Sequence, residues 1–534
     1  DMTLVAREVE EVEMGSDHGN AATQPPVEKI TPMEIEDAAV VTEDTVQKYS
    51  NDDDEAMKAF ARYQGPPLVL DEATNKRLLR TIDWHLMPVL CLVFGLNYLD
   101  KTTLSYASVM GIKEDIHLVK DNYQWLGSIF YLGFLIWEYP TNRLLQVLPL
   151  AKYSAFCVTA WGGVLALSAT LTNFSGGMAI RFFLGMFEAA SMPGFALLSS
   201  QWYTVKEHNS RTGIWISSNG WGQIVGGLVA YGISRSVSEQ GAALAGWKII
   251  FIAIGCFTTL VGLLFFYVIP DNQLNCRWLN ERDRLLALER VRENEQGIGN
   301  TKFKWYQFRE ALLDPLNWAL FAYGVLSDIP NGGITNFFSQ LIENFGYSAQ
   351  ESLLYGTPGG AVVIVACVSN GLAGDYFQQR TLVACLPMLC ASIGMLLIIA
   401  LPISNDTGRL VGYYMTQALP ATGATVLSLI SSNIAGYTKK TTVAALYLIG
   451  YCTGNIIGPQ TFRPSDAPRY VSAEVTILVC FGLCIVDLLF INWWCRRENR
   501  RKAVIRARPD YVRLENQGWR DLTDRENPEF VYSL

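Results

Sequence analysis

Twelve apolar stretches, each long enough to cross a lipid bilayer, constrain the fold of this chain more than any other feature of its sequence. A membrane-spanning helix needs about 20 mostly apolar residues. Because the bilayer core offers no water to backbone N–H and C=O groups, stretches of this length are expected to be helices. The stretches are 84–107, 123–145, 151–172, 177–200, 212–234, 247–269, 316–340, 352–373, 380–403, 409–434, 440–461 and 470–494. The sequence therefore predicts an all-α membrane protein with twelve transmembrane helices.

The composition agrees with a membrane protein. Hydrophobic residues make up 50% of the chain and charged residues only 17%, against about 25% charged residues in soluble proteins. The net charge of -8 is misleading, because acidic residues crowd into residues 1–75 and the remainder is mildly basic. We expect 1–75 to be a disordered acidic tail. No part of the chain is basic enough to indicate a nucleic-acid partner.

The 11 cysteines do not indicate a metal site or a disulfide framework. Most of them lie inside apolar stretches, where Cys behaves as a small hydrophobic side chain, and no Cys or His spacing completes a ligand set. The sequence contains no recognisable pair of a nucleophile and a general base of the kind that would indicate an enzyme. We therefore expect no metal, no cofactor and no catalytic residues. Since the chain begins with Asp1, we expect it to be trimmed or incomplete there, and its first apolar stretch is too long for a cleavable signal peptide.

The apolar stretches fall into two sets of six, separated by a long polar segment. The sequence predicts an N-terminal bundle over 76–269, a middle loop over 270–314, a C-terminal bundle over 315–495 and a tail over 496–534. Within the middle loop, residues 279–290 alternate charges at helical spacing and predict a surface helix. Lys and Arg are more frequent in loops on the side of the two termini, which predicts that both termini are cytoplasmic.

A faint repeat relates the two halves. The fifth stretch contains Asn219-Gly220-Trp221-Gly222, and the eleventh carries Gly450, Gly454 and Gly458 at one-turn intervals. Small residues let helices approach closely and shift, as expected of two pseudo-symmetric six-helix bundles that rock against each other. Asn219 is accordingly a candidate substrate contact.

Four charged side chains within the apolar stretches form the candidate binding site. Asp100 and Lys101 are adjacent in the first stretch, and Arg181 and Glu188 lie two helical turns apart in the fourth. A charge at the bilayer centre costs from about 3 to more than 10 kcal/mol unless it meets water or polar partners. The cations could bind a carboxylate, and the acids could carry protons. The alternative is a pair of structural salt bridges, which are poor stabilisers for their cost.

Other polar side chains extend this candidate site. Asn97 and Tyr98 lie one helical turn before Lys101 and share its face. Glu138 precedes Arg143 near the predicted inner end of the second stretch, and we assign both to gating or packing. Asp487, near the end of the last stretch, is expected to be structural.

The loop after the eighth stretch reads Gly371-Leu372-Ala373-Gly374-Asp375 and continues to Arg380. The equivalent loop of the first half, after the second stretch, lacks the Gly and Asp. Asp375 and Arg380 are therefore predicted to form the better-developed gating loop.

Several segments together resemble one family. Residues 98–107 resemble the first-helix motif of the anion:cation symporters of the major facilitator superfamily. Five other segments resemble the fungal allantoate-permease-like branch of that family in particular: 137–146, 181–194, 246–251, 454–460 and 521–528. The resemblance covers about residues 75–530. It implies the major facilitator fold and proton-coupled uptake of an organic anion, such as a ureide or a vitamin acid, across the plasma membrane.

The resemblance also implies roles for individual residues. Asp100 and Glu188 would take the protons, Lys101 and Arg181 would hold the carboxylate, and Tyr98 and Asn455 would contact the substrate. Lys101 stands where many relatives carry Arg, so a point charge replaces a planar fork and the binding geometry is expected to differ.

Two other functions remain open on the sequence. An exporter of organic anions or toxic metabolites would use the same scaffold, although the fifth stretch has Val225 before Gly226-Gly227 and lacks the Pro of the exporter pattern. A non-transporting nutrient sensor would need a long folded cytoplasmic domain. The expected partners are a small organic anion, protons and the lipid bilayer, and the chain is expected to act as a monomer.

Overall fold

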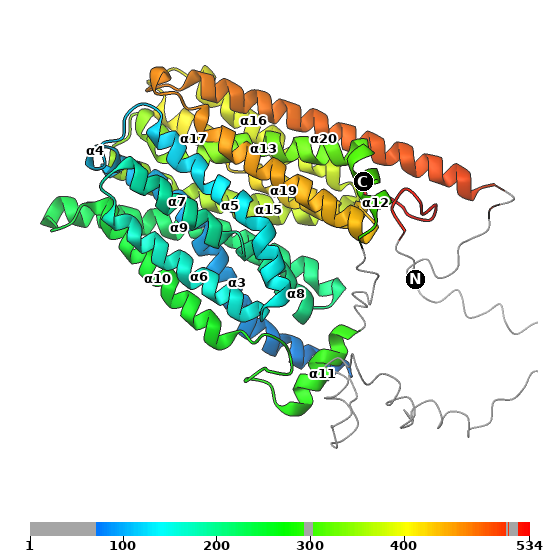
Figure 1. The fold of residues 1–534 in the computed structure, drawn as a ribbon. Helices are drawn as coiled ribbons and strands as arrows, with labels where there is room; N and C mark the ends of the chain where they lie inside the picture. The colour runs from blue at the N-terminus through cyan, green and yellow to red at the C-terminus, as the bar shows by residue number, and fades with distance from the viewer. Residues whose placement is uncertain (1–70, 293–302, 509–510, 512–521) are drawn as a thin grey trace, which may run out of the picture. The chain divides into compact units, whose positions relative to one another are not determined.

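Each of the twelve predicted stretches coincides with a helix, or with two consecutive helices, in a computed structural model that describes residues 71–292, 303–508, 511 and 522–534. The first half comprises α3 (Glu72–Val109), α5 (Asn122–Val147), α6 (Leu150–Leu167), α7 (Phe174–Glu188), α8 (Ser191–Trp202), α9 (Val205–Gln240) and α10 (Gly246–Val268) (Figure 1). The second half comprises α13 (Pro315–Asn344), α14 (Ala349–Tyr355), α15 (Thr357–Phe377), α16 (Arg380–Ala400), α17 (Asp406–Thr416), α18 (Leu419–Asn433), α19 (Tyr437–Gln460) and α20 (Val471–Arg506). The all-α prediction is confirmed.

Eight spans in the described part are long and apolar enough to cross a membrane by length and composition alone. The spans that fail this test are α5, α9, α13 and the α17–α18 pair. The helix α13 shows the reason, because it buries Ser327, Asp328, Asn336 and Gln340 along its length. Helices inside a membrane bundle need not be apolar all round, since their polar faces meet other polar groups.

Three predicted helices are broken. The fourth stretch ends as α7 at Glu188 and restarts as α8 at Ser191, while Gly356 separates α14 from α15. The tenth stretch divides into α17 and α18 in the same way. The restarting helices α15 and α18 carry Pro in their first turn, where the missing N–H costs nothing and the ring prevents the preceding helix from continuing.

Several helices extend beyond their apolar stretches. The helix α3 begins at Glu72, inside the segment assigned to the acidic tail, and α20 continues to Arg506. The rest of that tail, residues 1–70, lies outside the described residues, as do 293–302, 509–510 and 512–521. The bundle boundaries drawn from the sequence therefore stay a prediction.

The predicted surface helix of the middle loop is confirmed as α11 (Glu281–Arg292), and a second helix, α12 (Trp305–Leu313), precedes α13. Two charges of α11 are paired with the first half. Arg77 of α3 forms an ion pair with Asp283 at 2.6 Å. Arg290 is buried and pairs with Glu207 of α9. Some of the alternating charges that predicted the helix thus also attach it to the first half.

We call the end of the helices near α4 (Ile112–Asp115) the α4 end, and the end near α11 and α12 the α11 end (Figure 1). Hydrogen bonds between the halves lie between the middle of the helices and the α4 end. Four of them join Lys113 Nζ to Gln340 Oε1 (2.6 Å), Tyr123 OH to Asn336 O (2.7 Å), Gln124 Nε2 to Phe462 O (2.7 Å) and Ser128 Oγ to Ile456 O (2.7 Å). The halves are therefore tied together toward the α4 end.

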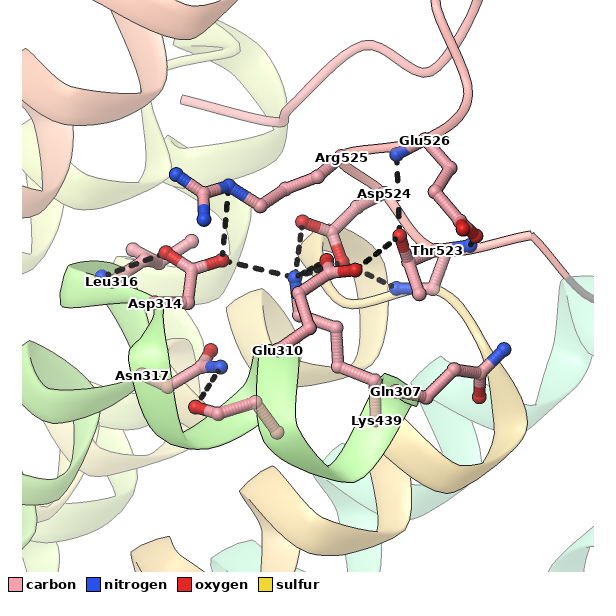
Figure 2. Close-up of polar contacts among 12 residues, drawn as sticks. Gln307, Glu310, Asp314, Leu316, Asn317, Lys439, Thr523, Asp524, Arg525 and Glu526 are labelled. Carbon is pink, nitrogen blue, oxygen red and sulfur yellow. Dashed lines mark hydrogen bonds and ion pairs between the residues drawn. The ribbon is translucent and has the colours of Figure 1, made fainter. Parts of the chain in front are cut away.

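Residues 522–534, which we call the C-terminal strap, lie across the α11 end of the second half. Figure 2 shows the carboxylate of Asp524 beside the ammonium group of Lys439, which also pairs with Glu310 and Asp314. Further along the strap, Tyr532 donates its hydroxyl proton to Asp524 at 2.7 Å. Burial, together with the charge of Asp524, raises the pKa of Tyr532, so this hydroxyl stays protonated and can donate.

The strap also contacts three other helices of the second half, α20, α18 and α16. Lys502 of α20 donates to the backbone carbonyl of Asp524, and Asn499 exchanges two hydrogen bonds with the backbone of Tyr532. Asn433 of α18 pairs in the same way with Ser533. The backbone N–H of Arg380, at the start of α16, donates to the carbonyl of Leu534. The strap therefore holds together helix ends that are far apart in the sequence.

Candidate substrate and proton site

Asp100 is fully buried in the last third of α3 and faces α6. The indole Nε1 of Trp161 donates a hydrogen bond of 2.7 Å to Asp100 Oδ2. Asp100 Oδ1 is buried without a hydrogen-bond partner in the described part of the chain. Since an unpaired buried acceptor is costly, this oxygen is available to a proton or to a group that enters the site.

Lys101, one residue further along, faces a different direction and meets α7. Its Nζ lies 3.0 Å from Glu188 Oε1 and 3.1 Å from Asn97 Oδ1. Asn97 Nδ2 donates to the same Glu188 oxygen at 2.6 Å. Successive residues of a helix point about 100° apart, which explains why neighbouring charges have separate partners. The structure thus joins Asn97, Lys101 and Glu188 in one buried network.

Arg181, about two turns into α7, faces α5. Its Nε donates to the carbonyl of Leu126 at 3.2 Å, and its guanidinium lies 5.3 Å from the centre of the Phe130 ring. Lys101 Nζ lies 6.0 Å from the same ring. Both cations therefore lie near the same aromatic ring, whose faces attract cations. Arg181 Nη1 has no hydrogen-bond partner among the described residues, so a donor remains for an anion.

Close packing of α5 against α7 fixes these positions. A β-carbon added at Gly185 would overlap the carbonyl oxygen of Phe130, and one at Gly133 would overlap that of Phe182. Only glycine lets the two backbones approach so closely. The two glycines thereby set the distance between Phe130 and the charged residues of α7.

The four charges predicted from the sequence do lie in one region, but they are not equivalent. Lys101 and Glu188 form an ion pair, whereas Asp100 and Arg181 act on the others through their charge without direct pairing. The alternative interpretation expected two structural salt bridges. The structure has one ion pair, between Lys101 and Glu188, while Asp100 and Arg181 each keep a buried atom without a hydrogen-bond partner among the described residues.

The second half contributes a polar network that the sequence reasoning missed. Asp328 of α13 accepts hydrogen bonds from Asn455 Nδ2 of α19 at 3.0 Å and from Asn331 Nδ2 at 3.3 Å. Asn331 Nδ2 also donates to Asn455 Oδ1 at 3.0 Å. Asp328 could have been found by the criterion applied to Asp100, since it is an acid inside an apolar stretch, followed by Pro330 and Gly332-Gly333.

The remaining residues predicted to contact the substrate differ in how deeply they are buried and in whether their polar atoms have partners. Tyr98 is half-buried on α3 near Thr335 of α13. Asn219 is half-buried on α9, and its Oδ1 has no partner in the described part. Asn455 is fully buried and committed to the Asp328 network. These residues come from both halves, as a site between two moving bundles requires.

The predicted gating residues lie toward the α11 end. Glu138 accepts a hydrogen bond from Asn142 at 3.0 Å, the helical neighbour four residues on. Arg380 Nη1 donates to Ser428 Oγ of α18 at 3.3 Å, and its backbone is held by the strap. Arg143 lies on α5 with an exposed side chain, and the side chain of Asp375 lies outside the described part. Their gating roles stay predictions.

Comparison with known proteins identifies relatives along most of the chain. The family model described as Major Facilitator Superfamily matches residues 90–459. An uncharacterized transporter of Schizosaccharomyces pombe is 41% identical over 470 residues, which cover 87% of this chain and 91% of the relative. The allantoate permease of Saccharomyces cerevisiae is 35% identical over 497 residues, covering 90% of each protein. The thiamine pathway transporter THI73 of the same yeast is 32% identical and also covers 90% of each.

Solved structures show the same fold at low sequence identity. A D-xylose-proton symporter superposes with a TM-score of 0.57 at 16% identity, covering 76% of this chain and 97% of that one. An inward-facing bacterial homolog of the human lysosomal transporter Spinster superposes with a TM-score of 0.56 at 16% identity, covering 80% and 97%.

Proposed function

Because the chain belongs to the Major Facilitator Superfamily, we propose that it takes up a small organic anion together with protons by alternating access. It is an integral, multi-pass membrane transporter and not an enzyme, because its family and its relatives are transporters. The proposal includes a plasma-membrane location, cytoplasmic termini and action as a monomer. With that orientation the α4 end is the outer end, and the hydrogen bonds between the halves there correspond to an inward-facing conformation.

The observation that carries the proposal is the Lys101–Glu188 ion pair at 3.0 Å. A substrate carboxylate and the Glu188 carboxylate would compete for the same ammonium group. A proton on Glu188 removes its charge and leaves Lys101 free to bind the substrate. Loss of that proton restores the ion pair and expels the anion. Proton binding and anion binding are thereby coupled at one atom, Lys101 Nζ.

Arg181 and Asp100 complete the proposed exchange. Arg181 Nη1 lacks a partner among the described residues and supplies a second donor to the carboxylate. Asp100 Oδ1 is likewise unpaired and supplies a second place for a proton. The allantoate permease among the relatives supports an organic anion, such as a ureide or a vitamin acid, as the substrate class.

Uptake into membrane vesicles tests this function. A panel of labelled carboxylates should enter faster as the outer pH falls, and a protonophore should abolish accumulation. We expect Glu188→Gln to keep exchange of substrate across the membrane but to lower proton-driven accumulation at least about tenfold, the size of a typical coupling between two ligands.

The matched control is Glu239→Gln, which breaks the exposed Arg235–Glu239 pair of α9 and should leave accumulation unchanged. If Glu188→Gln still concentrated the substrate to the wild-type level, the coupling role would be wrong. Accumulation confined to inside-out vesicles would instead support an exporter.

A further inference from the structure

Asp328 is a buried acid with an unusual set of partners. The residue is only 6% exposed. Its carboxylate accepts hydrogen bonds from three neutral donors, the side chains of Ser327, Asn331 and Asn455. Within the described ranges, no Lys, Arg or His side chain forms an ion pair with it. The charge of Lys101, in the first half, acts on Asp328, and that ammonium group is already bound to Glu188 and Asn97.

The hydrogen bonds fix the direction of the Asn455 amide. Its Nδ2 donates to Asp328 and to the carbonyl of Tyr451 at 2.9 Å, so both amide protons are used. Its Oδ1 is left as the acceptor, where it meets Asn331. The Asp328 carboxylate accepts two hydrogen bonds at Oδ1 and one at Oδ2. Since a carboxylate offers about four acceptor sites, the second half still presents an acceptor at Asp328 Oδ2.

The first half presents the opposite polarity. Arg181 Nη1 is a buried donor without a hydrogen-bond partner among the described residues. Lys101 becomes a free donor once Glu188 is protonated. A ligand held between the halves would thus meet donors on one side and acceptors on the other. An anion with an apolar remote end would leave the buried Asp328 carboxylate, which has no ion-pair partner among the described residues, facing a group that cannot donate, which is costly.

We propose that Asp328, aligned with Asn331 and Asn455, determines specificity by binding an N–H donor, an amino or amide group, at the end of the substrate remote from its carboxylate. This inference rests on the proposed function, which supplies the carboxylate site. The substrate then bridges the two halves, so its binding favours the conformations in which the halves approach each other.

Paired substrates test the inference in vesicles that contain the full chain. One series consists of ω-amino carboxylates of increasing length, and the other consists of carboxylates with a methyl group in place of the amine. Wild-type protein should take up the amino member of the best-fitting pair with a kcat/KM at least about tenfold higher, as expected where a site hydrogen-bonds its substrate. Asp328→Asn should abolish that preference and leave the methyl series within about twofold of wild type.

Two further variants separate recognition from folding. Asn331→Ala removes one donor that aligns Asp328 and should weaken uptake of the amino series only. Asp487→Asn alters another acid of the second half, on α20, and should change neither series. The folded fraction of each variant is measured by gel filtration.

Each other outcome has a distinct meaning. Equal uptake of both series by wild-type protein, or an equal loss of both in Asp328→Asn, would overturn the role of Asp328. Uptake of the amino series without any dependence on a proton gradient would overturn the proposed coupling but not this role. No uptake of either series would overturn both.

Discussion

Replacing Lys439 with methionine is expected to destabilise the second half severely. The ammonium group of Lys439 is fully buried and lies 2.9 Å from oxygens of Glu310 and Asp314 and 2.8 Å from Asp524 (Figure 2). Methionine would keep most of the side-chain volume but would leave three carboxylates facing one another. Removing one partner of a buried ion pair typically costs about 3–5 kcal/mol. That loss is a large part of a total stability of about 5–15 kcal/mol.

Thermal unfolding of the purified protein in detergent measures this effect, and limited proteolysis reports whether the strap stays bound. The control is Lys76→Met, because the Lys76–Glu72 pair is exposed and such pairs contribute at most about 1 kcal/mol. Adding Asp524→Asn to Lys439→Met should recover part of the loss, since one of the three charges is removed. An unchanged melting temperature in Lys439→Met would show that the cluster does not hold the strap.

Replacing Gly185 with alanine is expected to be as damaging, although it adds a single carbon. The new β-carbon would overlap the Phe130 carbonyl oxygen, which belongs to the backbone of α5 and cannot rotate away. The helices α5 and α7 must then separate, and Arg181 and Glu188 move with α7. Overpacking costs about 1–3 kcal/mol where side chains can adjust and more where they cannot. We therefore expect little folded protein, and no uptake by the fraction that folds.

Gly163→Ala provides the matched control. Gly163 lies on α6 in the same half, and a β-carbon there meets nothing within 4 Å. Because alanine favours helix more than glycine by about 1 kcal/mol, this variant should be neutral or slightly stabilising. Expression level, gel filtration and carboxylate uptake are compared for the two variants. Equal behaviour of Gly185→Ala and Gly163→Ala would show that the α5–α7 distance is not set by glycine.

Much of the fold was predictable because a bilayer imposes strong local conditions. A long and mostly apolar stretch has no alternative to a helix inside a bilayer, and each of the twelve predicted stretches coincides with one helix or with two consecutive helices, although only eight spans in the described part pass the test of length and apolarity. Breaks and extensions were harder to predict. The restart at Ser191 depends on local geometry that apolarity does not report, and the continuation of α20 to Arg506 lies in a polar segment outside the membrane.

The candidate site was predictable to the extent that charge in hydrocarbon is rare. Asp100, Lys101, Arg181 and Glu188 were identified because each is costly where it lies, and the structure does gather them. Their pairing could not be predicted, because it depends on how helices rotate about their axes. Asp328 was overlooked although the same criterion applied to it.

By itself, the sequence determined the class of the protein, the positions of its apolar stretches and the charged residues that we propose bind an anion and a proton. It did so because transfer of each segment into hydrocarbon is a local property, set by the side chains of that segment. Only the tertiary structure decided that Lys101 meets Glu188 while Asp100 meets Trp161, that Asp328 directs the Asn455 amide, and that residues 522–534 bind Lys439. These contacts join residues far apart in the chain, and their energies depend on distances that no local pattern encodes.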